Sequence, residues 1–441
     1  MADSTLNDRA TVVPASRIAR LTRLGSMTAG VAGNMAMNGV VQLGQGKRPT
    51  MRNLLLTPAN VRRVTEQLAQ MRGAAMKIGQ LVSMDTGDVL PAELSEIMAR
   101  LRSDAHFMPP AQLKKVLNSN WKCGWLQAFD RFDVRPIAAA SIGQVHRARL
   151  KDGRQLAIKV QYPGVSQSID SDVTNVGALI KLSGLLPAGF ELAPYLEEAR
   201  KQLHEETDYI REGQHLADFK ALLEDDARFE LPSLHEEWTT REILAMSFVE
   251  ALSIEAVADH SQEERDKVAH DLIDLLFSEL FTFGLMQTDP NFANYRYNPE
   301  TGRVVLLDFG ATRRIDPGIT DLYRRLIVAG LAQDSKAQYQ IGIELGLFDL
   351  ETKSSHQDRI VKMIGMVFAE LKDSTEFDFA KTDLSRHLQA EGMILAEEGF
   401  VPPPLPIDAL YLQRKFGGIF LLARKLKARL PVTQLMEARL F

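Results

Sequence analysis

The sequence predicts an α+β protein of two lobes, in which a small β-containing lobe follows a helical extension and precedes a larger helical lobe. Two strand-like runs, Gln144–Leu150 and Gln155–Gln161, flank an Asp-Gly pair that is a strong hairpin signal. Apolar residues recur at helical spacing before these strands, in TPANVRRVTEQLAQMRGAAMKIGQLVSM, and again from about Glu264 onward. A hairpin between two helical regions is the pattern that favours this fold class.

Length and composition fit an ordinary globular protein large enough for two lobes. The chain has 441 residues, of which 45% are apolar and 25% charged. A net charge of −5 argues against a nucleic-acid-binding protein, which would normally be strongly basic. The single cysteine, Cys123, excludes internal disulfides and a Cys-rich zinc site, and it favours a reducing compartment.

Residues 1–55 are predicted to be a leader that can associate with a membrane. Leu24–Gly46 carries no charge, but its asparagines and glutamines make it a poor membrane-spanning helix. Cationic residues flank it, so it can lie on an anionic bilayer, pack against another helix, or form a mobile amphipathic leader. A cleaved secretory signal is not expected, because the apolar part is weak and starts late. A mitochondrial presequence stays open, although Asp3 and Asp8 count against it.

Residues 56–130 are predicted to form the helical extension. Thr57 can cap its first helix and Pro58 suits the first turn. A second helix is expected over Ala92–Leu101, and a third begins near Met108. The apolar positions of the first helix recur at helical spacing: Val61, Val64, Leu68, Met71, Ala75, Ile78 and Val82.

Residues 131–255 are predicted as the β-containing lobe with inserted helices, and residues 256–441 as the helical lobe. After the hairpin, helical spacing covers about Pro194–Leu223, and REILAMSFVEAL predicts one more buried strand that runs into a connector. The later helical pattern is interrupted by MQTDPNFANY and by RVVLLDFG. A small β lobe followed by a larger helical lobe is the layout of a bilobal protein-kinase-like fold with an α-helical N-terminal extension.

Two features of this layout suit phosphoryl transfer, which needs phosphates held in place and charge neutralised. Lys159, in the apolar strand LAIKVQ, is placed to reach α- and β-phosphates, although a surface lysine on an alternating strand is the alternative. Asp289 and Asn294 have the spacing of a kinase catalytic loop, in which the aspartate orients the nucleophile and the asparagine binds a metal. A simple turn is the alternative there, because Asp-Pro and Asn are common turn formers.

Two further features complete the set. Asp308 ends the apolar strand VVLLD before Phe-Gly, where Mg²⁺ prefers a carboxylate oxygen, and a purely structural turn is the alternative. The stretch AAASIGQV, Ala138–Val145, takes the place of a glycine-rich phosphate loop, but only Gly143 remains. Alanine side chains restrict φ and keep backbone amides away from phosphates, so a small-residue turn is the alternative.

The four features occur in the order in which kinases carry them, and this joint occurrence favours the kinase-like interpretation. No His-Arg precedes Asp289, so no arginine is expected beside this aspartate to sense an activating phosphate. No Ala-Pro-Glu follows Asp308, and GATRRIDPGITDLYRRL runs almost directly into a helix. A platform for extended peptide substrates is therefore not expected.

Taken together, the motifs resemble the UbiB or aarF-domain family of atypical kinases, and among them the coenzyme Q kinase-like ATPases. The resemblance covers the chain from about Val13 to its end. It rests on MRGAAMKIGQLVSMD, IAAASIGQVH, AIKVQYPGV, EETDYIREG, QTDPNFANY and LLDFGATR, with VPPP and RKFGG near the C-terminus.

The resemblance assigns regulatory roles to five residues. Lys77, Gly79 and Gln80 match the Lys-x-Gly-Gln motif of a helix that folds over the active site in the family. Without the resemblance, Lys77 would be interpreted as a solvated helix cation. Glu206 and Asp208 match a Glu-x-Asp motif that couples this extension to the nucleotide site, whereas composition alone favours an exposed acidic helix face.

The resemblance also assigns the nucleotide site. Glu212 matches the glutamate that pairs with the catalytic Lys159, and its distance along the sequence implies an inserted segment before its helix. The residues expected to bind nucleotide besides Lys159 are Ala138, Ala139, Ala140 and Ser141 of the alanine-rich loop, and Met246, Ser247, Phe248 and Val249 of the hinge.

The resemblance implies an atypical kinase-like ATPase that uses ATP or ADP with Mg²⁺ and supports ubiquinone biosynthesis at a membrane. The expected partners are an adenine nucleotide, anionic membrane lipid, a quinone-like precursor and coenzyme Q biosynthesis proteins, but no nucleic acid. The alternatives are a true small-molecule or lipid kinase and a nucleotide-gated scaffold. The expected location is the cytoplasm, peripheral to the inner membrane, in a bacterium, or the mitochondrion in a eukaryote.

Overall fold

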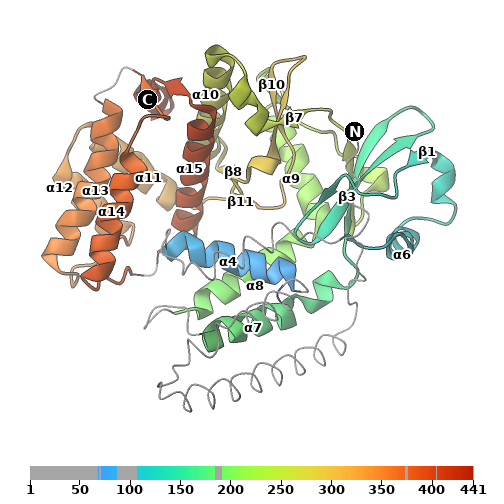
Figure 1. Cartoon of the computed structure of the whole chain (residues 1–441), viewed down its shortest axis with the longest axis horizontal. Helices are drawn as coiled ribbons and strands as arrows, with labels where there is room; N and C mark the ends of the chain where they lie inside the picture. Colours follow the sequence, from blue (N-terminus) through green and yellow to red (C-terminus); the bar gives the residue numbers. More distant parts are fainter. Residues whose placement is uncertain are drawn as a thin grey trace, which may run out of the picture. The chain divides into compact units, whose positions relative to one another are not determined.

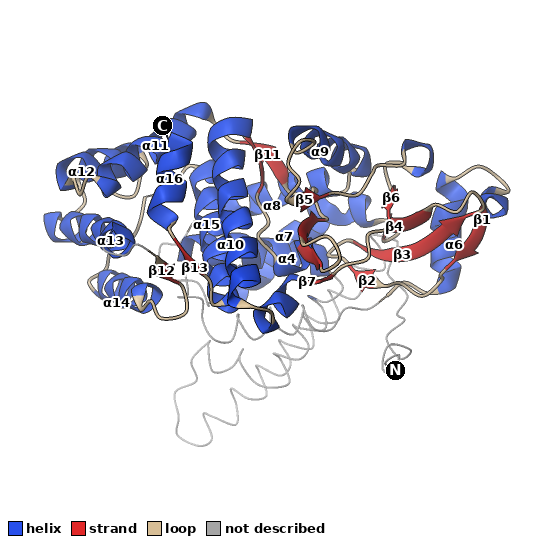
Figure 2. Cartoon of the chain, turned by 90° about the horizontal axis from the view of Figure 1, so that it is seen from above, coloured by secondary structure: helices blue, strands red, loops and turns tan. Residues whose placement is uncertain are grey.

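A computed structural model describes Leu68 and residues 71–86, 107–183, 191–372, 376–403 and 405–440. The predicted leader, the Thr57 helix start and the predicted helix over Ala92–Leu101 lie outside the described residues. The chain divides into two compact units, which Figures 1 and 2 draw. The first unit runs to Gln214 and includes Ser233–Phe248, and the second comprises His215–Pro232 and everything from Val249.

The first unit is built on a five-stranded antiparallel sheet in the order β1-β3-β4-β6, with β2 paired to β3. The predicted hairpin is confirmed, because β3 and β4 pair directly and Gly153 takes a left-handed φ of 95° in the turn between them. The strands are β1 (Phe129–Phe132), β2 (Ala138–Ala139), β3 (Gly143–Leu150), β4 (Gln155–Gln161) and β6 (Ile243–Ser247).

One face of this sheet carries an aromatic core. Helix α6 (Pro110–Asn120) packs there with Leu156, Ile158 and Val160 of β4. The tryptophans join this core: Trp121, Trp125 and Trp238. Because strand side chains alternate between faces, Lys159 lies on the face opposite Ile158 and Val160.

Helices cover the chain between β4 and β6. Figure 1 shows α4 (Arg72–Thr86), α7 (Val165–Ser183) and α8 (Ala193–Glu206) side by side, followed along the sequence by α9 (Tyr209–Leu222). Helices α7 and α8 stand where an insertion before the Glu212 helix was predicted. Helix α4 packs against α7 and α8, so the described part of the extension contacts this insertion.

The helical region predicted over about Pro194–Leu223 is confirmed, and it consists of the two helices α8 and α9. Thr207 leaves the first helix with ψ near 4°, and its hydroxyl donates to the His204 carbonyl. The Asp208 carboxylate then accepts the Arg211 amide at 3.2 Å and caps the second helix. Ile210, in the first turn of α9, is exposed.

The second unit places a small sheet beside a large group of helices. The sheet has the order β5-β10-β9-β7, and β8 pairs separately with β11. The described strands of this unit are β5 (Phe229–Glu230), β7 (Leu252–Ser253), β8 (Leu285–Gln287), β9 (Tyr295–Asn298), β10 (Arg303–Leu306), β11 (Thr312–Arg314), and the paired β12 (Phe377–Asp378) and β13 (Arg429–Leu430). Its described helices are α10 (Gln262–Ser278), α11 (Pro317–Leu331), α12 (Ser335–Glu344), α13 (Ser354–Lys372), α14 (Leu384–Glu397), α15 (Ile407–Leu426) and α16 (Val432–Leu440).

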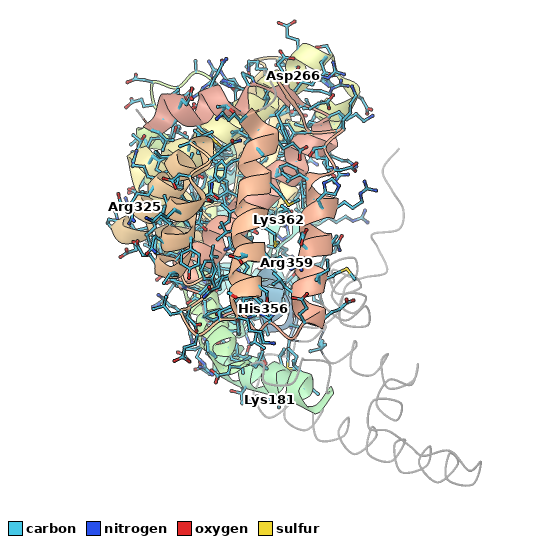
Figure 3. The ribbon with its side chains drawn as sticks, turned by 90° about the vertical axis from the view of Figure 1, so that its left-hand side faces the viewer. Lys181, Asp266, Arg325, His356, Arg359 and Lys362 are labelled. Carbon is cyan, nitrogen blue, oxygen red and sulfur yellow. The ribbon has the colours of Figure 1, made fainter. Side chains whose placement is uncertain are left out.

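Ion pairs join the outer helices of this unit. Figure 3 shows His356, Arg359 and Lys362 along α13, and Arg325 on α11. Arg359 and Lys362 both pair with Glu391 of α14, which ties the two helices together at their polar faces. Figure 2 shows α10 and α15 side by side, and α10 also packs against β10 and β13.

None of the helices within the described part of the chain has the length and hydropathy needed to cross a bilayer.

Candidate active site

The first unit brings Lys159 and Glu212 together. The Lys159 ammonium donates to both carboxylate oxygens of Glu212, at 2.7 and 3.0 Å. Lys159 is 7% exposed and Glu212 is 2% exposed, so both charges are largely removed from water. Buried charges of this kind persist only when they are paired, and the ring of Tyr209 adds a cation–π contact 5.2 Å from the ammonium. The interpretation of Lys159 as a solvated surface lysine is therefore wrong.

The described part of the extension reaches the alanine-rich loop through a second ion pair. Lys77 of α4 is 7% exposed and pairs with Glu206 at the end of α8. Ser141 donates to the other oxygen of Glu206 at 3.5 Å. Lys77 is thus not the solvated helix cation that its sequence context suggests. Glu206 contacts both the extension and the loop that was predicted to bind nucleotide.

The other residues of these two motifs lie differently. Gly79 is buried and Gln80 is half-buried on α4. Asp208 acts as the cap of α9 and has Arg241 at 3.6 Å, but it does not contact Lys77. The two acidic residues of the Glu-x-Asp motif therefore have different partners. Glu206 pairs with the extension, and Asp208 caps the helix that carries Glu212.

The alanine-rich loop is a tight turn rather than an open glycine loop. Ala138 and Ala139 form β2, and the Ala140 amide donates to the Gly143 carbonyl at 2.8 Å. Gly143 is required by close approach, because a Cβ there would lie 2.4 Å from the Val160 carbonyl oxygen. The one glycine that remains in this loop thus serves the packing of β3 on β4.

A buried polar chain supports the strand after this loop. The Met108 amide donates to the Gln144 side-chain oxygen at 2.8 Å, and the Gln144 amide nitrogen lies 2.9 Å from His146 Nε2. The Gln144 nitrogen can only donate, so His146 Nε2 accepts and carries no proton. The imidazole is therefore neutral, and its Nδ1 donates to the Asp133 carbonyl at 2.8 Å. Burial lowers the pKa of His146 from its ordinary value of 6.5 to about 4.

The predicted hinge residues follow the buried edge of the sheet. Met246 and Ser247 end β6, where Met246 pairs with Ala157 of β4. The Phe248 amide donates to the Gln155 carbonyl at 2.9 Å. The chain passes from the first unit to the second between Phe248 and Val249, so the predicted hinge coincides with the boundary between units.

The second unit brings Asp289 and Asn294 together. The Asn294 side-chain nitrogen donates to the Asp289 carbonyl at 3.1 Å and to its carboxylate at 3.2 Å. This orientation leaves the amide oxygen of Asn294 directed away from Asp289. Asn291 caps the short helical turn Phe292–Asn294 by accepting the Ala293 amide at 3.1 Å. The simple-turn alternative is partly right, because a turn exists, but its two polar ends are joined.

Asp308 is positioned beside this loop by backbone pairing. Tyr295 of β9 pairs with Leu306 of β10, and the Leu307 amide donates to the Asn294 carbonyl at 3.1 Å. Asp308 follows immediately, and its carboxylate accepts the Gly310 amide at 3.0 Å. Asn294 therefore comes just before β9 and Asp308 just after β10, at the same end of this antiparallel pair.

The residues at this end fit a magnesium ion by their donor chemistry. An amide oxygen from Asn294 and a carboxylate from Asp308 are hard oxygen ligands, which Mg²⁺ prefers. The nitrogen of Asn294 is already used on Asp289, so the hydrogen bonding of the loop selects the oxygen as its available ligand atom.

Helix α15 supplies an arginine that the sequence reasoning missed. Arg414 pairs with the Asp289 carboxylate, so a cation does stand beside this aspartate although no His-Arg precedes it. Asp408, near the start of the same helix, accepts the Asp316 amide at 2.9 Å and lies 3.3 Å from Arg313. The only sequence signal for Arg414 was its place in the RKFGG motif.

The segment after Asp308 is short, as predicted. It forms β11 against β8, and helix α11 begins at Pro317 with Asp316 as its cap. Arg313 stacks over the ring of Tyr411 at 4.2 Å, which fixes this segment on α15. There is little chain between Asp308 and Pro317 with which to bind an extended peptide.

A family profile described as the ABC1 atypical kinase-like domain matches residues 100–341. The Saccharomyces cerevisiae protein named atypical kinase COQ8, mitochondrial, is 39% identical over 429 residues, which cover 96% of this chain and 85% of that protein. This chain belongs to the ABC1 atypical kinase-like family. The Rattus norvegicus atypical kinase COQ8B, mitochondrial, is 36% identical over 435 residues, covering 96% of this chain and 80% of the rat protein.

The protein-kinase-like fold predicted from the sequence is confirmed. The solved structure of Rv3197 from Mycobacterium tuberculosis with erythromycin superposes with a TM-score of 0.60 at 23% identity. It covers 85% of this chain and 94% of that one. Membership of the ABC1 family makes this chain an enzyme of the atypical kinase class.

Proposed function

We propose that this ABC1-family enzyme is a kinase-like ATPase that uses Mg·ATP to support ubiquinone biosynthesis at a membrane. The observation that carries the proposal is the buried Lys159–Glu212 pair on the AIKVQ strand. A lysine held in this way is a fixed cation rather than a flexible one, and phosphoryl transfer depends on such fixed charges. The family relationship supports the same reading.

The first unit would hold the nucleotide by its phosphates and its base. Lys159 binds the α- and β-phosphates, and Glu212 keeps the ammonium in place. The backbone of Met246–Val249 contacts adenine, and the loop Ala138–Ser141 covers the phosphates. Because the loop is alanine-rich, its amides approach the phosphates less closely than in a glycine loop.

The second unit would supply the metal ligands and the group that orients the nucleophile. Asn294 and Asp308 hold Mg²⁺, which neutralises the charge that develops on the phosphates when it is bound. Asp289 accepts a hydrogen bond from the nucleophile and aligns it. Arg414 fixes the Asp289 carboxylate by pairing with it, so no activating phosphate is needed to place Asp289.

The nucleophile is small. The short segment between Asp308 and Pro317 offers no peptide platform, so water or the hydroxyl of a small molecule is the acceptor. A kinase acting on a quinone-like precursor is the second candidate, and the same residues serve it. A nucleotide-gated scaffold is less consistent with a chain in which Lys159, Glu212, Asp289, Asn294 and Asp308 are all present.

The proposed place of action is the surface of the membrane that carries ubiquinone synthesis. The named COQ8 relatives are mitochondrial, and a bacterial chain would act peripherally on the inner membrane from the cytoplasm. Anionic lipid, a quinone-like precursor and other coenzyme Q biosynthesis proteins are its proposed partners. The Lys77–Glu206 pair would let the extension influence the loop at Ser141.

Thermal stabilisation by nucleotide tests the assignment of the metal ligand. Mg·ADP should raise the Tm of the wild-type chain, and Asp308→Asn should abolish this shift while leaving the Tm without nucleotide nearly unchanged. Asp321→Asn on the exposed part of α11 is the matched control and should behave as wild type. Equal stabilisation of Asp308→Asn and wild type would contradict the proposal.

The fate of the γ-phosphate separates the two candidate reactions. With γ-labelled ATP, Mg²⁺, liposomes and a quinone-like phenol, an ATPase releases the label as free phosphate. A small-molecule kinase transfers it to the phenol, where chromatography would find it.

A further inference from the structure

The buried ammonium of Lys415 contacts both ends of the loop that carries Asp289 and Asn294. It donates to the Gln287 carbonyl at 2.7 Å and to the Gln287 side-chain oxygen at 3.2 Å, just before the loop. It also donates to the Tyr295 hydroxyl at 3.1 Å, just after the loop. One charged group is therefore bonded to the residues that precede and follow Thr288–Asn294.

The burial of this lysine is unusual for a residue without a direct chemical role. Lys415 is 2% exposed, and a lone ammonium in such surroundings would be costly. Glu279, which is 1% exposed, lies 3.0 Å from it and supplies the opposite charge. Burial raises the pKa of Glu279. Burial opposes the charge of Lys415, but the neighbouring Glu279 carboxylate outweighs it, so the pKa of Lys415 is raised.

Glu279 is tied to the same loop. It begins the π-helical turn Glu279–Phe283 at the end of α10, and its carboxylate accepts the Gln287 amide at 3.3 Å. Gln287 therefore has its amide on Glu279 and its carbonyl on Lys415. The start of the loop is held from two helices, α10 and α15, by one ion pair.

The neighbouring residues on α15 face the same loop. Arg414 pairs with Asp289, and Gly418 lies one turn beyond against Pro290. A Cβ at Gly418 would come within 2.4 Å of the Pro290 side chain, so the helix backbone approaches the loop closely. Residues at this spacing share one helix face, and that face covers the loop from end to end.

We propose that Lys415 is a positioning residue that fixes the span of the Thr288–Asn294 loop and thereby the orientation of the Asn294 amide oxygen toward a magnesium ion. The inference rests on the proposed function and deepens it. A hydrogen bond at each end sets the separation of Gln287 and Tyr295, and Asn294 is adjacent to Tyr295. Loosening the Tyr295 end lets Asn294 rotate, which weakens metal binding without removing a ligand.

The Tyr295 hydroxyl gives the sharpest test, because its removal leaves the buried ion pair intact. In Tyr295→Phe, the free Mg²⁺ concentration that gives half-maximal thermal stabilisation by ADP should rise about fivefold, as expected for one lost hydrogen bond. Tyr323→Phe is the matched control, since the Tyr323 hydroxyl donates to the Ala409 carbonyl of α15 at 3.3 Å and does not touch the loop. It should keep the wild-type Mg²⁺ dependence.

A second variant removes the charges together. The double substitution Lys415→Met with Glu279→Leu avoids an unpaired buried charge, and it should raise the Mg²⁺ requirement by tenfold or more. Should it fail to fold, the Tyr295→Phe result decides alone. If the wild-type chain shows Mg²⁺-dependent stabilisation and Tyr295→Phe matches Tyr323→Phe, the positioning role is wrong and the proposed function stands. If the wild-type chain shows no such stabilisation, both fail.

Discussion

Acidification should destabilise the first unit through His146. The imidazole is buried and neutral between the Gln144 side chain and the Asp133 carbonyl, and burial lowers its pKa from 6.5 to about 4. The unfolded chain therefore binds a proton at a pH where the folded chain does not. The His146 contribution is complete above pH 6.5 and is lost as the pH falls toward 4.

The size of this effect follows from the two pKa values. Linkage gives a loss of about 2 kcal/mol at pH 5 and about 3 kcal/mol at pH 4, relative to neutral pH. His146→Asn keeps a nitrogen that can donate to the Asp133 carbonyl but cannot be protonated in this range. We expect this variant to be less stable than wild type at pH 7 and to lose about 2 kcal/mol less between pH 7 and pH 5.

Tryptophan fluorescence during urea unfolding reports this unit selectively, because Trp121, Trp125 and Trp238 all lie in its aromatic core. The free energy of unfolding is obtained at each pH by linear extrapolation. His204→Asn, at a half-exposed histidine of the same unit, is the control and should keep most of the acid sensitivity of wild type. The same pH dependence for His146→Asn and wild type would refute the reasoning.

Three further substitutions test other parts of the account. Glu206→Gln leaves the buried Lys77 ammonium without its partner, so it should lower the free energy of unfolding by about 2–4 kcal/mol, measured by tryptophan fluorescence. Adding Lys77→Met in the same chain should restore most of this loss, and the absence of rescue would contradict the pairing. Gly143→Ala should lower the free energy of unfolding by about 3 kcal/mol, because its Cβ meets the Val160 carbonyl. Gly153→Ala should lower it by about 1 kcal/mol, because its penalty is conformational only, and equal losses would count against the close approach at Gly143. Arg414→Gln should lower kcat, measured by phosphate release, about tenfold or more, and it should leave the nucleotide Kd, measured by calorimetry, unchanged. A selective loss of nucleotide affinity would disprove the role of Arg414 at Asp289.

Local patterns in the sequence were sufficient for the elements whose signals are themselves local. A few neighbouring residues are enough to predict the Asp-Gly turn, the alternating strand around Lys159 and the apolar strand that ends at Asp308. The family resemblance added Glu212, which composition alone would have left on an exposed helix face. It did so because the pairing of Lys159 with Glu212 joins segments that local periodicity cannot relate.

The sequence was less informative where tertiary contacts decide the outcome. Helical spacing continued through Thr207, so the sequence did not show that Thr207 and the Asp208 cap divide this region into two helices. The two α15 residues that contact the Asp289 loop and its flanks were missed for a similar reason. Arg414 and Lys415 lie far along the chain, and nothing in the apolar pattern of their helix shows that one faces Asp289 and the other is fully buried.

The most direct test of the central claim is phosphate release from ATP by the purified full chain, measured over a range of Mg²⁺ concentrations with anionic liposomes and a quinone-like phenol present. The account predicts turnover that requires Mg²⁺ and that falls to background in Lys159→Met and in Asp308→Asn. Turnover that persists without Mg²⁺, or that survives in both variants, would contradict it.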